Sequence, residues 1–177
     1  MNRREFGKAS LGGAALLGLA SFGGLAMTGC NSLADYLQVA VDGVDSLFTL
    51  LGLPTTNPLV KDVNAAFGAA IAGANKYGSD NVAGDPVLVS LLDAVDTALQ
   101  TFLAQANIPS GLVTLILSAI EIVIGTIEGW IAKPPSTLKV KSGKPLTVVV
   151  KKRTASQFRS AWDSVVTLNN HPELRLK

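Results

Sequence analysis

The sequence GLVTLILSAIEIVIGTIEGWIA, residues 111–132, is apolar around nearly its whole circumference when it is drawn as a helix. Its polar and small residues form one narrow line at steps of four and three, comprising Thr114, Ser118, Glu121, Gly125 and Glu128. A segment of about 20 apolar residues is long enough to span a membrane, but Glu121 near its midpoint would be costly there. We therefore expect the central helix of a bundle, with its polar line facing solvent or a neighbouring helix.

Three more amphipathic helices are predicted on the N-terminal side of this segment. They cover about residues 33–51, residues 58–77, and a stretch from residue 86 to a point before Pro109. Ser32 supplies a capping residue for the first helix, and each of the other two follows an Asn-Pro or Asp-Pro pair. Behind each start, apolar residues recur at steps of three and four, which is the period of a helix with one buried face.

The chain changes character after residue 132. Lys133-Pro134-Pro135 breaks the helical pattern, and residues 137–141 and 146–151 then alternate around the turn signal SGKP at 142–145, as in a β-hairpin. A capping-box pattern at Thr154 and Gln157 starts a final helix that carries Phe158 and Trp162 on its core face. The expected fold class is mainly α, a helical bundle of about four helices with a C-terminal β-hairpin-like segment and a fifth helix.

The first 29 residues have the composition of a cleaved signal peptide, with a basic start, an uncharged stretch over residues 9–27 and small residues at the end. The segment NRREFGK at residues 2–8 resembles the twin-arginine export signal. Arg3, Arg4 and Phe6 match that pattern, whereas the next position holds glycine instead of the usual leucine. The resemblance implies export of a folded protein.

The segment Met27-Thr28-Gly29-Cys30 resembles a bacterial lipobox, with methionine in the usual place of leucine. In that family the chain is cut before the cysteine, which then carries fatty acyl chains such as palmitate. Cys30 is the only cysteine of the chain, so an internal disulfide and multi-cysteine metal sites are excluded. The resemblance implies a lipoprotein that begins at Cys30 and is anchored to a bacterial membrane on its periplasmic or cell-surface side.

The near-neutral net charge of +2 conceals two oppositely charged parts. Residues 30–132, the expected acidic four-helix bundle, hold ten acidic and two basic residues. Residues 133–177, the expected basic hairpin plus helix, hold ten basic and two acidic residues. We expect the basic part to pack on or beside the bundle; it is also suited to anionic lipid headgroups, to a protein partner or to self-association.

No residue pattern assigns a catalytic, cofactor-binding or metal-binding residue, and no nucleic-acid partner is expected. The single histidine, His171, is expected at the surface, which removes the usual nucleophile–histidine pairs. Glu121 and Glu128 lie seven residues apart on one helical line, but di-metal bundles also require a histidine. The acidic loop of Asp80 and Asp85 does not have calcium-loop spacing.

The leading functional hypothesis is a membrane-anchored, non-catalytic interaction or structural module. One alternative is a carrier that binds an apolar ligand or lipid within the bundle. Another is an enzyme that uses carboxylates alone, either Glu121 with Glu128 or Asp93 with Asp96. Helical bundles serve all three purposes, so the fold class alone does not choose among them.

Overall fold

The computed structural model describes residues 32–78, 80–140 and 144–177. Within these ranges the chain forms five α-helices: α1 (Leu33–Leu50), α2 (Pro58–Tyr77), α3 (Pro86–Gln105), α4 (Val113–Ile131) and α5 (Ala155–Leu168). The same residues form a two-stranded antiparallel sheet of β1 (Thr137–Leu138) and β2 (Leu146–Thr147), together with the short 3-10 turns η1 (Val82–Gly84), η2 (Ser110–Leu112) and η3 (Pro172–Leu174). The predicted mainly α fold, with four helices, a hairpin and a fifth helix, is confirmed.

The helices begin where the capping residues of the sequence place them. Asn57 and Asp85 accept hydrogen bonds from backbone N–H groups in the first turns of α2 and α3, and proline follows each of them. Ser32 caps α1, and Thr154 and Gln157 form a reciprocal capping box at the start of α5. Each cap pairs a backbone donor that the helix itself leaves free, which stabilises the fold by about 1 kcal/mol.

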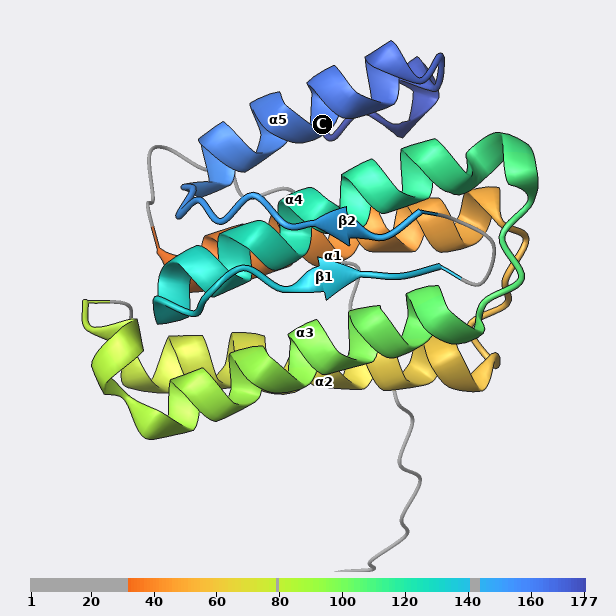
Figure 1. Cartoon of the computed structure of the whole chain (residues 1–177). Helices are drawn as coiled ribbons and strands as arrows, with labels where there is room; N and C mark the ends of the chain where they lie inside the picture. Colours follow the sequence, from red (N-terminus) through yellow and green to blue (C-terminus); the bar gives the residue numbers. More distant parts are fainter. Residues whose placement is uncertain (1–31, 79, 141–143) are drawn as a thin grey trace, which may run out of the picture.

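Each helix packs against the next one in chain order, and α5 packs against α1, which closes the arrangement. Figure 1 shows α2 and α3 side by side on one side of the molecule, α1 and α4 in the middle, and α5 on the other side. The hairpin lies along α4, between α3 and α5 (Figure 1). As a result α4 is covered on nearly every side, and 14 of its 19 residues are buried.

Two stretches of the described chain, Pro86–Gln105 and Ser110–Ile131, are long and apolar enough to cross a membrane. A buried core helix meets the same criteria, so length and composition are weak evidence for a membrane span. The second stretch contains α4, whose apolar residues are covered by the neighbouring helices and the hairpin. This burial fits the expected central helix of a bundle.

The hairpin is shorter than the sequence pattern predicts. Thr137 pairs with Thr147 and Leu138 pairs with Leu146, and one more bond joins the Val148 N–H to the Ser136 carbonyl. We call residues 148–153 the strap. After the Val148 N–H, backbone groups of the strap bond to α4 instead of β1, at Val149 and Lys151. Part of the predicted turn, residues 141–143, lies outside the described residues.

The strap covers the C-terminal part of the polar line of α4, from Glu121 onward, whereas Thr114 at its start is exposed. The line is expected from the sequence to face solvent or another helix. The Val149 N–H donates to Glu121 Oε1 at 3.2 Å, and the Lys151 N–H donates to the Gly125 carbonyl at 2.9 Å. These two bonds attach an extended backbone directly to a helix. The sequence therefore predicts the polar line of α4, but it does not predict that the strap packs on it.

Two glycines of α4 make this close approach sterically feasible. A Cβ atom on Gly125 would collide with the Val149 carbonyl, and one on Gly129 would collide with the backbone nitrogen of Lys152. Both colliding groups belong to the backbone, which cannot move aside as a flexible side chain could. The strap therefore requires glycine at both positions.

We expect Gly125→Ala and Gly129→Ala each to lower the free energy of unfolding by about 2–3 kcal/mol, because the strap must shift to admit a methyl group. Gly68→Ala is the matched control, since Gly68 is exposed in α2 and its Cβ would meet nothing within 4 Å. That change should be neutral or stabilising by up to about 1 kcal/mol. Urea denaturation provides the measurement, and α4 variants as stable as the control would contradict the close approach.

Candidate functional site

The residues assigned to export and lipidation, Arg3, Arg4, Phe6 and Cys30, lie outside the described residues. The described part begins at Ser32, and α1 begins at Leu33. The two candidate sites consist of residues of the folded body alone.

The buried polar side chains of the described chain gather on α3 and α4 beneath the basic segment. They are Asp96, Thr126 and Glu128, each with no exposed surface. Burying polar groups is costly unless they are hydrogen-bonded, so the partners of these three side chains define the junction between the acidic and basic parts. This junction is the first candidate site.

Lys133 connects the end of α4 to α3 through two carboxylates. Its Nζ donates to Asp93 Oδ1 at 2.8 Å and to Asp96 Oδ2 at 2.7 Å. Gln100 Nε2 donates to the other oxygen of Asp96 at 2.7 Å. Burial alone would lower the pKa of Lys133, but its hydrogen bonds and the charges of the two aspartates raise that pKa above the usual range. Lys133 therefore stays charged and compensates the buried Asp96.

Glu128 holds the chain where it leaves α4. Its Oε1 accepts the Ser136 N–H at 3.0 Å, whereas within the described residues Glu128 Oε2 and Ser136 Oγ are buried without a hydrogen-bond partner. Burial is the main cause that raises the pKa of Glu128, and the nearby Asp96 charge acts in the same direction. The bond from the Ser136 N–H and the charge of Lys133 oppose this rise only in part.

Arg153 ends the strap in a third polar contact. Its Nη1 donates to Thr126 Oγ1 at 3.0 Å, and its backbone carbonyl accepts from Trp130 Nε1 at 3.3 Å. Close by, the buried Tyr36 hydroxyl of α1 donates to the Val123 carbonyl at 2.8 Å. Burial raises the pKa of Tyr36 well above its ordinary value, so the phenol stays a hydrogen-bond donor. These contacts join α1, α4 and the strap.

The carboxylates considered for catalysis are engaged in structural contacts. Asp93 and Asp96 share Lys133, whereas Glu121 and Glu128 each accept a backbone N–H from the segment after α4. Among the described residues, no three His, Cys, Asp or Glu side chains lie close enough together to hold a metal ion. The junction is thus built to attach one part of the chain to another.

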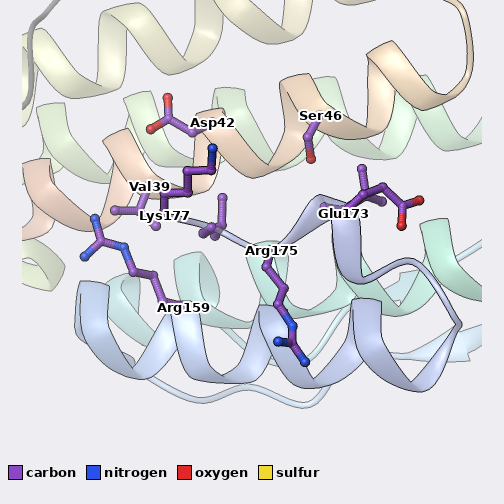
Figure 2. Close-up of a pocket in the computed structure, with 9 residues that line it drawn as sticks. Val39, Asp42, Ser46, Arg159, Glu173, Arg175 and Lys177 are labelled. Carbon is purple, nitrogen blue, oxygen red and sulfur yellow. The ribbon is translucent and has the colours of Figure 1, made fainter.

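The second candidate is an open pocket of about 260 Å³ between α1, α5 and the C-terminal tail. Figure 2 shows Lys177 extending toward Asp42 of α1, whereas Arg175 points away from α1, across α5. Arg175 donates to Thr167 Oγ1 at 3.0 Å. The lining mixes both charge signs with apolar side chains: Val39, Asp42, Ser46, Arg159, Glu173, Leu174, Arg175, Leu176 and Lys177. Neither a nucleophile with a base nor a set of convergent ligands is formed there.

His171, which was expected at the surface, borders this region and has a side chain that is 25% exposed. Its Nδ1 lies 2.7 Å from Glu173 Oε1, and this hydrogen bond lowers the pKa of the glutamate. The pair fixes the turn between α5 and the tail. Trp162, predicted for the core, is fully buried beneath that tail and donates to the Leu174 carbonyl at 2.9 Å.

No protein-family model, curated protein or solved structure matches the chain.

Because the pKa of Glu128 is raised, the free energies of unfolding of wild type and Glu128→Gln should differ in a pH-dependent way. Because the folded state binds this proton more tightly than the unfolded chain, unfolding free energy falls as pH rises from the ordinary value of 4.5 through the folded pKa. Glutamine keeps the acceptor for the Ser136 N–H and carries no charge. At a pH above the folded-state pKa of Glu128, we expect Glu128→Gln to be more stable than wild type. This difference in stability should shrink toward about pH 4.

Urea denaturation across this pH range measures the difference, and equal stability at every pH would contradict it. Glu128→Ala serves as the control, because it removes the acceptor together with the charge. It should destabilise the protein by about 2 kcal/mol, since the buried Ser136 N–H loses its partner.

The Lys133–Asp96 pair predicts strong coupling between two substitutions. Lys133→Gln should destabilise the protein by about 2 kcal/mol, because Asp96 stays buried without its counter-charge. The double variant Lys133→Gln/Asp96→Asn should recover most of this loss, since no charge is then left buried. Lys139→Gln, at an exposed hairpin position, is the control and should change stability by less than about 0.5 kcal/mol. Additive effects in thermal denaturation would argue against the pair.

Proposed function

We propose that this protein is an exported bacterial lipoprotein, anchored through Cys30, that acts outside the cytoplasm as a non-catalytic interaction or structural module. The observation that carries this proposal is the Met27-Thr28-Gly29-Cys30 segment, which places the chain's single cysteine at the end of an uncharged signal stretch. The arginine pair at Arg3 and Arg4 supports export by the twin-arginine route. Palmitate or a similar acyl group on Cys30 would supply the anchor.

The start of the folded body is compatible with such an anchor. The first helix begins at Leu33, three residues after Cys30. Each CH₂ group buried in a bilayer contributes about 0.8 kcal/mol, so two or three acyl chains give firm attachment. The body would then be held directly at the membrane surface.

The roles of the charged side chains support an interaction module over an enzyme. The four carboxylates considered for catalysis bind Lys133 or backbone groups, as described above. Other charges are left outward-facing, with Asp42 and Asp45 exposed on α1 and Lys151 and Lys152 exposed on the strap. A surface with separated acidic and basic regions is suited to a charged partner or to a second copy.

Metabolic labelling with a fatty acid tests the proposal. Wild-type protein should incorporate the label, whereas Cys30→Ala should lose it and keep the uncleaved signal, because the lipidated thiol is required for processing. Met27→Leu is the matched control, since it brings the segment closer to the usual lipobox and should label normally. A label that persists in Cys30→Ala, or an unlabelled wild type, would contradict the proposal.

A further inference from the structure

The start of α1 lies at the same end of the body as the strap. The Tyr36 hydroxyl, in the first turn of α1, donates to the Val123 carbonyl of α4, and the Tyr36 ring packs edge-on against Phe158 of α5 at 5.3 Å between centroids. The strap joins the same half of α4 through Lys151 and Gly125. Figure 1 likewise shows the beginnings of α1 and α5 and the end of α4 at one end of the molecule.

The distance from Cys30 to this end is limited by the chain. Cys30 and Leu33 are separated by three residue steps. A fully extended chain spans at most about 3.6 Å per residue, so the two residues can be no more than about 11 Å apart. An acyl anchor on Cys30 would thus keep this end of the body at the bilayer surface, whatever path the intervening residues take.

This end presents cations to the membrane. Lys151 and Lys152 are exposed, and Lys152 Nζ lies 3.9 Å from the centre of the Trp130 ring. Both residues contact α4 through the backbone of the strap. The Lys152 ammonium also lies on the face of the Trp130 ring, and both side chains stay exposed to solvent.

The acidic groups nearest to the strap are held in contacts of their own. Asp93 and Asp96 share the single charge of Lys133, Glu128 is buried, and Glu121 accepts the Val149 N–H. The η1 turn also packs against α4 at this end, and the exposed Asp80 precedes it. Lys151 and Lys152 are the exposed cations that the strap contributes here.

We propose that this end is the membrane-facing surface and that Lys151 and Lys152 bind the headgroups of anionic phospholipids. The inference rests on the proposed function, because the anchor at Cys30 brings the surface to the bilayer. One basic side chain at an anionic leaflet strengthens association about fivefold, and two strengthen it about 25-fold. Lipid binding would fix the orientation of the body and turn the exposed acidic residues of α1 into a separate surface for partners.

The test uses the full-length protein purified from membranes, with acylation verified by mass. It is reconstituted into vesicles of phosphatidylcholine alone, or mixed with phosphatidylglycerol, each containing a lipid with a headgroup nitroxide that quenches tryptophan emission. Trp130, 6% exposed and in contact with Lys152, is the reporter, whereas Trp162 has no exposed surface. We expect strong quenching in the anionic vesicles, weak quenching in phosphatidylcholine, and loss of the difference at high salt.

Lys151→Gln/Lys152→Gln should reduce the quenching in anionic vesicles to the phosphatidylcholine level. The matched control, Lys139→Gln/Lys144→Gln, removes the same charge from exposed hairpin positions beyond the paired strands and should keep the quenching. Trp130→Phe should abolish the signal.

Equal quenching in both lipids by acylated wild type would overturn the orientation while leaving the anchor in place. Loss of quenching in the hairpin variant alone, or quenching that survives Trp130→Phe, would overturn it equally. A protein without acyl mass would instead overturn the proposed function itself.

Discussion

The direct contact between the backbone of the strap and α4 is the constraint on which the rest of the structure depends. It requires glycine at positions 125 and 129, because any side chain there would occupy the space of the strap backbone. Once the strap is seated, Arg153 reaches Thr126 and α5 can begin at Ala155. Helix α5 then closes the ring against α1, where a Cβ on Gly43 would meet the Trp162 ring. A helix that is apolar nearly all round thus becomes a core helix because the C-terminal segment covers its polar line from Glu121 to Glu128.

The charges at the junction determine where the C-terminal segment packs more than they stabilise the fold. A buried ion pair gains little net free energy over an apolar pair of the same size, because both groups must be desolvated. Removing one partner is costly, however, so a wrongly placed segment would leave Asp96 buried without Lys133. Among the basic residues that the structure describes, Lys133 alone pairs with a buried carboxylate, whereas Lys151 and Lys152 stay exposed. The proposed membrane-facing surface rests on this division between inward and outward cations.

The sequence predicts the helices well because their signals are local. Asn57, Asp85 and Thr154 cap helices where the pattern places them, and the apolar period identifies the buried faces. The partner of the polar line could not be predicted, since the bond from Val149 to Glu121 joins residues 28 positions apart and leaves no periodic trace. A contact between residues far apart in the sequence also explains why the strands are shorter than predicted. The β-branched residues after 147 suit a hairpin, yet from Val149 onward the backbone bonds to α4. The sequence shows Asp93 and Asp96 as a candidate carboxylate pair, but nothing in the neighbouring residues indicates that Lys133 joins them.

Hydrogen exchange of the strap amides tests most directly the claim that the strap is part of the core. The Lys151 amide is bonded to the Gly125 carbonyl and the Val148 amide to the Ser136 carbonyl. If the ring of helices depends on the strap, both amides exchange as slowly as those in the middle of α4, through global unfolding. Exchange of Lys151 at the rate of an exposed chain, while the α4 amides stay protected, would show that the bundle holds together without the strap and would contradict the account.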